Sequence, residues 1–475
     1  METLLIESQT EIEKIFHSQQ KNKSTVGSST ARERIEKLKK LHAALLQFQP
    51  DLEASMYADF KKHPTEVVLT EIFAVQTELK HVIKHLKSWM RPQKVATPIT
   101  LLGTSSAIYA QPKGVVLIIS PWNFPINLTL CPLVSAVAAG NCVMIKPSEI
   151  TAHTSAILKK MIESVFEPSE VAVLEGNQDV AAQLLDLPFN HIFFTGSPAI
   201  GKIVMQAAAK NLTSVTLELG GKSPVVVDET ADLEEAAGKI VMGKYLNSGQ
   251  ICISPDYLFV HESRKDGLIK AISQKIESFY GLKDQQINNP DYARIVNNRH
   301  FERVKTILDD AVLQGASIAY GGKSDSQQNY ISPTLLTGVH SDMRVLKEEI
   351  FGPLLPILSY QKLENVIEII NNGEKPLALY IFSKNSKNQE KIIAETRSGG
   401  ICINDCLLHF LNNNLPFGGD NNSGIGKSHG KFGFDSFSNA KAVLKQHTRY
   451  SAMKLLLPPY TPRVQKLTNL LLKWF

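Results

Sequence analysis

The chain contains a series of short strands that are apolar at nearly every position, and this feature constrains its fold most. The runs are "GVVLIIS", "CVMIKPSE", "VAVLEG", "HIFFTG" and "SVTLELGG", which begin at residues 114, 142, 171, 191 and 214. Stretches with helical spacing separate them. A strand without a polar face is buried on both sides, as in a parallel sheet that helices cover on both faces. The sequence therefore predicts a doubly wound α/β domain of the nucleotide-binding kind.

The rest of the chain divides around this series. Before it, Ser29 or Thr30 can cap a helix, and leucines recur at helical steps after the cap. Proline, glycine and β-branched residues then predict an extended arm, and a further mixture of strands and helices predicts a second α/β domain. We assign residues 1–93 and 113–221 to the first domain, 222–430 to the second, 94–112 and 431–450 to a bridging β element, and 451–475 to a tail.

The composition excludes several classes of protein. Hydrophobic residues make up 43% and charged residues 20% of the 475 residues, as in an ordinary globular chain. The net charge of +5, without a basic stripe, argues against nucleic acid as a partner. The five cysteines form no CxxC pair, so we expect no disulfide framework, no metal and a reducing, cytoplasmic setting. The acidic N-terminus does not resemble a signal peptide.

The tail, "SAMKLLLPPYTPRVQKLTNLLLKWF", is apolar but is broken by prolines and charges. It therefore lacks the ~20 uninterrupted apolar residues that a membrane span needs. Its last stretch predicts an amphipathic helix, which we expect to pack on its own chain. Contact with a membrane surface through Trp474, Phe475 and the lysines is the alternative, so a peripheral membrane location stays open.

Several polar motifs follow strands of the first series directly. They are "PWNFP" at 121–125, "KPSE" at 146–149, "FTGSPAIGK" at 194–202 and "LELGGKSP" at 217–224. Open α/β sheets bind their ligands at the carboxyl ends of strands, so these motifs are candidates for one site.

These motifs occur with "GQICIS" (249–254), "EEIFGP" (348–353) and "LPFGG" (415–419), and the set resembles the aldehyde dehydrogenase superfamily over about residues 5–450. Further stretches, such as "GQICISPDY" and "HGKFGFDSFS", resemble its class 3 branch, which includes fatty aldehyde dehydrogenases. The resemblance implies an NAD(P)-binding domain, a catalytic domain and a β oligomerisation arm. It also implies a homodimer that oxidises an apolar aldehyde, medium- or long-chain aliphatic or aromatic, to the carboxylic acid.

Cys252, Glu218 and Asn123 are the catalytic candidates. The Cys252 thiolate can add to an aldehyde and form first a thiohemiacetal and then a thioester. Asn123 can hold the oxyanion together with the backbone N–H of Cys252. Glu218 is a charged residue among apolar ones, and burial would raise its pKa toward the working pH and make it a base for water. The structural alternatives are a core cysteine, a glutamate held by backbone donors and a turn asparagine.

The cofactor candidates lie in the same motifs. Gly196 and Ser197 occupy a strand-to-helix turn, where free N–H groups and the helix dipole favour a pyrophosphate. Glu149 would accept both ribose hydroxyls and repel a 2′-phosphate, so we expect NAD, with NADP open. By resemblance, Glu349 and Phe351 hold the nicotinamide end. The other residues assigned to the cofactor are Trp122, Lys146, Ser148, Gly176, Phe194, Thr195, Ile200, Leu219 and Gly220.

Two other functions remain open from the sequence. One is a non-catalytic scaffold of the same fold, which the presence of all three catalytic candidates disfavours. The other is an enzyme that transfers the thioester to coenzyme A, whereas Glu218 favours transfer to water.

Overall fold

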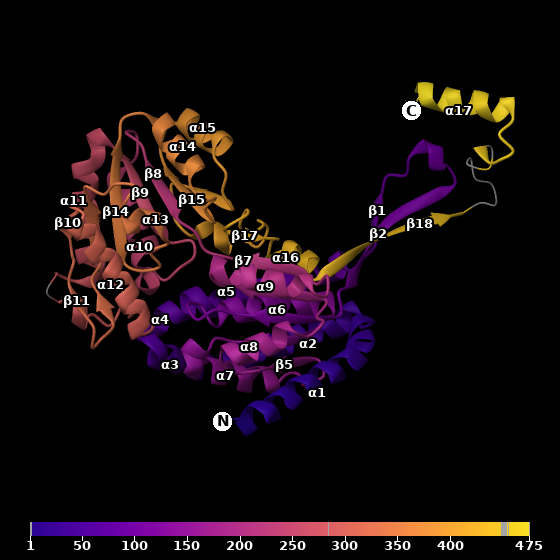
Figure 1. The fold of residues 1–475 in the computed structure, drawn as a ribbon, viewed down its shortest axis with the longest axis horizontal. Helices are drawn as coiled ribbons and strands as arrows, with labels where there is room; N and C mark the ends of the chain where they lie inside the picture. Colours follow the sequence, from indigo (N-terminus) through magenta and orange to yellow (C-terminus); the bar gives the residue numbers. More distant parts are fainter. Residues whose placement is uncertain (1, 284, 448–453, 455, 475) are drawn as a thin grey trace.

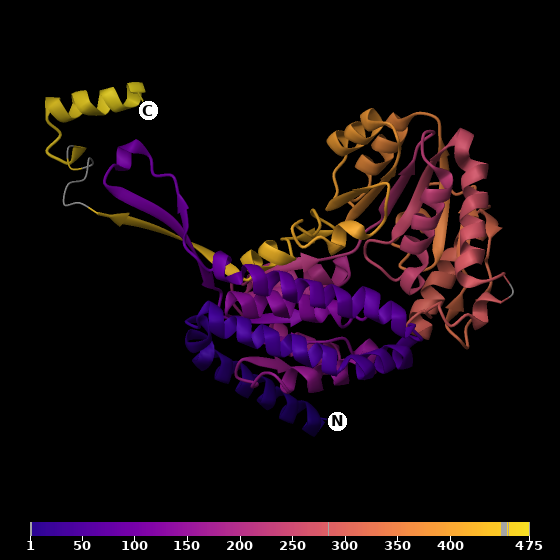
Figure 2. The ribbon, with the colours of Figure 1, turned by 180° about the vertical axis from the view of Figure 1, so that it is seen from behind.

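The chain forms two α/β bodies and a β arm that extends from the first of them (Figure 1). This computed structural model describes residues 2–283, 285–447, 454 and 456–474. Seen from behind, helices of the N-terminal segment cover the first body (Figure 2). The C-terminal helix lies beyond the arm, far from both bodies.

The first body is built on a six-stranded sheet in the order β17-β7-β6-β3-β4-β5. Its strands are β3 (Val115–Ile119), β4 (Cys142–Lys146), β5 (Val171–Val173), β6 (His191–Thr195), β7 (Ser214–Glu218) and β17 (Gly424–Ile425). All neighbours pair in parallel except β17, which runs antiparallel to β7. This confirms the predicted doubly wound parallel sheet.

Helices cover both faces of this sheet, which explains why its strands are apolar throughout. Val115 and Leu117 face one hydrophobic core, whereas Val116 and Ile118 face the other. The helices of the first face are α1 (Glu2–Gly27), α8 (Gln178–Leu185) and α9 (Pro198–Ala209). Those of the second are α2 (Ala31–Gln47), α3 (Gln49–Phe60), α5 (Phe73–Trp89), α6 (Asn127–Ala139), α7 (Ala152–Glu163) and α16 (Gly430–Ser436). Thr30, one of the two residues predicted to cap a helix, caps α2. Its hydroxyl accepts the Glu33 N–H, and the Glu33 side chain accepts the Thr30 N–H.

The second body contains a seven-stranded sheet in the order β10-β13-β14-β9-β8-β15-β16. Its strands are β8 (Ser223–Val227), β9 (Pro255–His261), β10 (Ser317–Tyr320), β13 (Thr334–Thr337), β14 (Leu354–Tyr360), β15 (Ala378–Phe382) and β16 (Gly400–Ile403). Its main helices are α10 (Leu233–Tyr245), α11 (Lys265–Tyr280), α12 (Asn298–Leu313), α14 (Leu363–Asn372) and α15 (Ser386–Glu395). The second α/β unit is therefore present, and the exact domain boundaries stay a prediction.

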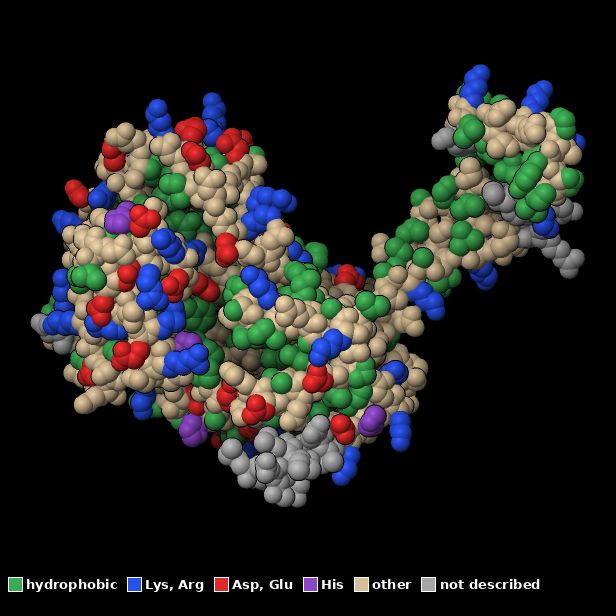
Figure 3. Space-filling model, viewed as in Figure 1, with side chains coloured by type: hydrophobic (Ala, Val, Ile, Leu, Met, Phe, Trp, Pro, Cys, Tyr) green, Lys and Arg blue, Asp and Glu red, His purple; other side chains and the backbone are tan. Residues whose placement is uncertain are grey.

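The arm is a three-stranded antiparallel sheet of β1 (Gln93–Val95), β2 (Thr104–Pro112) and β18 (Ser438–Gln446). It confirms the predicted extended arm and the further strand near residue 438, although residue 448 lies outside the described residues. Ile99, Leu102 and Leu444 are exposed on it. Figure 3 shows hydrophobic side chains along its surface.

The tail forms the expected helix, α17 (Pro462–Trp474), but not the expected contact. None of its residues is buried, because β18 carries the chain away from both bodies before the helix begins (Figure 1). The prediction that it packs on its own chain is therefore wrong for these residues, and Phe475 lies outside the described residues. Within the described ranges, no helix combines the length and apolarity needed to cross a membrane.

Candidate active site

The candidate residues lie at the point in the first sheet where the order of the strands reverses. The chain moves from β3 to β4 and β5 on one side, and then to β6 and β7 on the other. Ligands of doubly wound sheets bind at the carboxyl ends of strands beside such a switch point. A cavity of about 310 Å³ lies there, and the predicted residues on its wall are Trp122, Asn123, Thr195, Gly196, Ser197, Glu218, Leu219, Gly220, Cys252, Glu349 and Phe351.

Cys252 lies on a tight loop that precedes β9. Asn247, Ser248 and Gly249 all have left-handed backbone angles, with φ of 53°, 55° and 75°. A Cβ on Gly249 would overlap the carbonyl oxygen of Gly352, so only glycine allows this close approach. The loop of the second body that holds Cys252 is thereby packed against the "EIFGP" loop.

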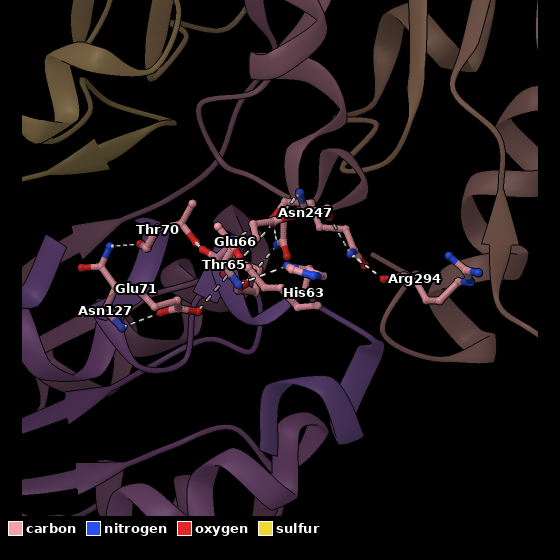
Figure 4. A network of polar contacts seen from close by, with 11 residues as sticks. His63, Thr65, Glu66, Thr70, Glu71, Asn127, Asn247 and Arg294 are labelled. Carbon is pink, nitrogen blue, oxygen red and sulfur yellow. Dashed lines mark hydrogen bonds and ion pairs between the residues drawn. The ribbon is translucent and has the colours of Figure 1, made fainter. Parts of the chain in front are cut away.

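A buried network fixes the Cys252 loop to the loop that carries Asn123. The Asn247 backbone N–H donates to Glu66 Oε1 at 2.9 Å (Figure 4), and its Nδ2 donates to the carbonyls of Asn123 (3.0 Å) and Gln250 (3.2 Å). Asn123 Nδ2 in turn donates to the Gln250 carbonyl at 3.0 Å. Asn247 and Glu66 were not predicted from the sequence, because neither belongs to a spacing pattern that indicates catalysis.

A second part of this network anchors the beginning of α6. Glu71 Oε2 accepts the Asn127 backbone N–H at 2.7 Å (Figure 4). The fully buried Lys62 ammonium lies 3.8 Å from both Glu66 and Glu71. Burial raises the pKa of Glu71 to about 7, and Lys62 opposes that rise. This charge cluster does not line the cavity around Cys252. It holds the Cys252 loop through Asn247 and the start of α6 through Asn127.

The surroundings of Cys252 favour the thiol over the thiolate. Burial, with a smaller contribution from the carboxyl groups of Glu349 and Glu218, raises its pKa to about 12. The backbone N–H groups of Cys252 and Ile253 act in the opposite direction but do not compensate. A nearby base must therefore take the proton if this sulfur is to act as a nucleophile.

Glu218 ends β7 and is 6% exposed. Burial raises the pKa of its carboxyl to about 8, while the Ser428 hydroxyl and the Lys427 ammonium lower it. Ser428 donates to Glu218 Oε1 at 2.8 Å, and Oε2 has no hydrogen-bond partner among the described residues. The carboxyl is therefore not held by backbone donors, contrary to the structural alternative, and it has the raised pKa expected of a base. Ser428 was also missed from the sequence.

Asn123 is 3% exposed and lines the same cavity as Cys252. An amide NH₂ group has two N–H donors, and the bond to the Gln250 carbonyl uses one of them. The geometry therefore leaves one Asn123 donor for an atom in the cavity.

The residues near Glu349 form a cradle that fits the nicotinamide end of a dinucleotide. Glu349 Oε1 is buried without a hydrogen-bond partner among the described residues. A Cβ on Gly220 would overlap the Glu349 carboxylate, so the absence of a side chain at Gly220 lets this carboxylate pack against the backbone. Trp122 lies edge-on to Phe351 with ring centroids 5.4 Å apart. Arg303, which the sequence analysis missed, donates to the carbonyls of Glu349, Ile350 and Phe351 and fixes this loop.

The remaining predicted cofactor residues do not line the cavity. They are Lys146, Ser148, Glu149, Gly176, Phe194 and Ile200, which lie at or just beyond the carboxyl ends of β4, β5 and β6 and at the start of α9. Lys146 and Glu149 form an ion pair. Ser197 caps α9 by accepting the Ile200 N–H at 3.5 Å. The six residues outside the cavity thus lie on the same edge of the sheet as the cavity, at the ends of neighbouring strands.

A second cavity, of about 40 Å³, meets the first at Cys252 and Glu218. Its wall is mainly apolar and includes Leu128, Leu377, Phe410 and Phe417. The sulfur and the buried carboxyl therefore lie where the cavity beside the Glu349 loop meets a cavity with a mainly apolar wall.

Comparisons with known proteins show the family to which the chain belongs. The model of the aldehyde dehydrogenase family matches residues 4–443. The 4,4'-diaponeurosporen-aldehyde dehydrogenase of Staphylococcus aureus (strain NCTC 8325 / PS 47) is 45% identical, over 90% of this chain and 92% of that protein. Aldehyde dehydrogenase family 3 member A2 of Pongo abelii is 42% identical, over 91% of this chain and 88% of that protein.

Solved structures show the same fold. The substrate-bound state of Staphylococcus aureus AldH has a TM-score of 0.92 and 43% identity, over 97% of this chain and 99% of that one. An indole-3-acetaldehyde dehydrogenase in complex with NAD⁺ has a TM-score of 0.85 and 25% identity, over 92% of this chain and 89% of that one. These findings confirm the predicted fold class and family. The chain belongs to the aldehyde dehydrogenase family and is an enzyme that oxidises aldehydes.

Proposed function

We propose that the enzyme oxidises apolar aldehydes with NAD(P) through a covalent thioester on Cys252, which water then hydrolyses with Glu218 as the base. The observation that carries this proposal is the position of Cys252 and Glu218 on the wall shared by the two cavities. The sulfur can reach an aldehyde in the apolar cavity, and the buried carboxyl can reach a proton on either the thiol or a water molecule.

The chain's own residues divide the steps between them. Glu218 accepts the thiol proton, because the pKa of about 12 keeps Cys252 protonated at neutral pH. The sulfur adds to the carbonyl carbon, and the free N–H of Asn123 and the backbone N–H of Cys252 hold the oxyanion. When bound, the nicotinamide supplies the acceptor for the hydride that leaves the thiohemiacetal carbon. After Glu218 has released the thiol proton to solvent, it takes a proton from water while the water oxygen attacks the thioester carbon; the Cys252 sulfur leaves, and the acid is released.

The cofactor is proposed to lie along the carboxyl edge of the first sheet. Glu349 and Phe351 would hold the nicotinamide ribose and ring, and the Gly196–Ser197 turn would hold the pyrophosphate. Lys146 and Glu149 would hold the adenosine ribose. The Glu149 carboxylate disfavours a 2′-phosphate, so NAD is expected to give a higher kcat/KM than NADP. A clear preference for NADP would contradict the role of Glu149.

The apolar wall of the second cavity supports an apolar substrate, aliphatic of medium or long chain or aromatic. A relative named for an aldehyde of diaponeurosporene, and another in aldehyde dehydrogenase family 3, support the same substrate class. Each buried CH₂ group contributes about 0.8 kcal/mol, so kcat/KM is expected to rise with chain length until the cavity is full.

The test is NADH formation with aldehydes from two to sixteen carbons and an aromatic aldehyde. Activity that rises with chain length supports the proposal, whereas a preference for acetaldehyde contradicts the apolar substrate. Added coenzyme A distinguishes the acylating alternative, because its product would be an acyl-coenzyme A and not the free acid. No NADH from any aldehyde would favour the non-catalytic scaffold.

The exposed apolar residues of the arm support a homodimer. A surface that carries Ile99, Leu102 and Leu444 in contact with water is more stable when a second chain covers it. Sedimentation is expected to give twice the mass of one chain, and charged substitutions at Leu102 and Leu444 are expected to shift the protein toward the monomer. A monomeric wild-type protein would contradict the dimer.

The exposed helix α17 lies far from both bodies of its own chain (Figure 1). It is therefore proposed either to cover the substrate entrance of a second chain or to contact a membrane. A chain that ends at His447, with unchanged long-chain KM and liposome binding, would exclude both roles.

A further inference from the structure

A smaller pocket, of about 20 Å³, adjoins the apolar cavity. The two share Asn127, Cys131, Phe410 and His429 on their walls, so they form neighbouring parts of one hollow. The pocket lies between α5, α6 and the segment that follows β16. Residues of α5 line the small pocket and not the apolar cavity, whereas Cys252 and Glu218 line the apolar cavity only.

Two buried polar side chains in this pocket have atoms without partners. Glu78 is 2% exposed, and its Oε1 accepts the Gly430 backbone N–H at 2.8 Å. Its Oε2 has no hydrogen-bond partner in the part of the chain that the structure describes. The same is true of Nδ2 of Asn413, which is 9% exposed. Both residues line the small pocket.

Unpartnered groups of this kind are costly. A buried donor or acceptor that lacks a hydrogen bond costs about 1–3 kcal/mol, and most buried polar groups in native proteins have a partner. Two of them on one pocket, next to the cavity proposed for the substrate, indicate that a polar group enters the pocket when a ligand is bound.

The two atoms also restrict the chemistry of that group. Asn413 Nδ2 donates, and a carboxylate oxygen such as Glu78 Oε2 accepts. A hydroxyl group satisfies both at once, since it accepts one hydrogen bond and donates another. A carboxylate would be repelled by Glu78, and a buried ammonium would face the Asn413 donor and lose its hydration.

The remaining titratable groups on the pocket agree with a neutral ligand. Burial lowers the pKa of His429 to about 4, and it raises the pKa of Cys131, so both are uncharged at neutral pH. Burial raises the pKa of Glu78 to about 7, with the Gly430 N–H opposing the rise. A hydroxyl can accept from the protonated carboxyl or donate to the ionised one.

We propose that this pocket is a subsite for a hydroxyl group that the substrate carries away from its aldehyde carbon, with Glu78 and Asn413 as its hydrogen-bond partners. The enzyme accordingly accepts hydroxyaldehydes whose chains are otherwise apolar. This inference rests on the proposed function, because it places the chain of the aldehyde in the cavity beside the pocket.

The test compares ω-hydroxyaldehydes with unsubstituted aldehydes of the same length, from four to twelve carbons, by kcat/KM. Each added carbon places the hydroxyl farther from the aldehyde carbon, so one chain length is expected to bring it to the pocket. At that length the kcat/KM of the hydroxyaldehyde, divided by that of the unsubstituted aldehyde, is expected to reach a maximum. Asn413→Leu is expected to lower this ratio about tenfold, the effect of one lost hydrogen bond. Glu78→Gln is expected to lower it less, because its amide NH₂ can still donate to a hydroxyl but cannot accept from one.

The variants are chosen to preserve the fold. Gln at position 78 keeps an oxygen for the Gly430 N–H, and Asn413 Nδ2 has no partner among the described residues to lose. Both variants are expected to keep kcat/KM for the unsubstituted aldehydes within a few-fold. Asn414→Leu is the matched control, because Asn414 is exposed and does not line the pocket, and its ratio is expected to equal that of the wild type.

The outcomes separate this inference from the proposed function. If unsubstituted aldehydes are oxidised but no length shows a maximum in the ratio, or the variants leave the maximum unchanged, the pocket holds only buried water and the subsite is overturned. If no aldehyde of either series gives NADH, the proposed function fails and the subsite fails with it.

Discussion

Replacing Cys252 with alanine is expected to abolish aldehyde-dependent NADH formation, with kcat at least about 10⁴-fold lower. Without the sulfur, no thiohemiacetal forms, and hydride does not leave readily from a carbon that lacks an oxyanion. Cys252 lies on both cavities, and the other cysteines line neither the dinucleotide cavity nor its junction with the apolar one. NADH absorbance under saturating cofactor and aldehyde measures the loss.

The matched control is Cys402→Ala, since Cys402 is also partly buried but lines neither cavity. Burial raises the pKa of its thiol as well, so a general effect of removing a thiol would appear in both variants. Cys402→Ala is expected to retain activity within a few-fold. Equal losses in the two variants, or substantial activity in Cys252→Ala, would contradict the assignment of the nucleophile.

Replacing Glu218 with glutamine is expected to lower kcat by roughly 10²- to 10⁴-fold, the usual contribution of a general base. Glutamine keeps the shape and can still accept the Ser428 hydroxyl, but it cannot take a proton from the thiol or from water. Both the formation and the hydrolysis of the thioester are expected to slow, so rapid mixing of the variant with NAD and aldehyde should show no fast initial formation of NADH. A variant that keeps the wild-type kcat would exclude Glu218 as the base.

The pH dependence provides an independent test of this base. Because burial raises the pKa of Glu218 to about 8, its ionised, basic form increases as the pH rises through that value, and kcat is expected to rise with it. The Ser428 hydroxyl stabilises the ionised form, so Ser428→Ala is expected to raise this pKa and move the profile to higher pH. An unchanged profile in Ser428→Ala would show that another group controls the rate.

The apolar strands made the doubly wound sheet predictable, because burial on both faces requires apolar residues at every position. The motifs at the ends of β3, β6 and β7 were predictable for a related reason: parallel strands bring their carboxyl ends to one edge. Residues that follow these strands, such as Asn123 and Glu218, lie on one cavity as the topology requires.

The supporting contacts were not predictable from the sequence. Glu66 and Asn247 are 181 positions apart, and Ser428 and Glu218 are 210 positions apart. Neither pair forms a local pattern, so only the folded chain brings them together. The tail shows a different limit: its amphipathic spacing predicts a helix with an apolar face, but the spacing does not say which surface covers that face.

The most direct test of the central claim is the mass of the Cys252 peptide during turnover. The wild-type enzyme is mixed with NAD and a long-chain aldehyde and quenched with acid, which preserves thioesters, and its peptides are analysed by mass spectrometry. The account predicts the acyl group of the aldehyde on Cys252, dependent on the cofactor and removed by hydroxylamine. An enzyme that forms NADH while Cys252 stays unmodified, or that carries the acyl group on another residue, would contradict it.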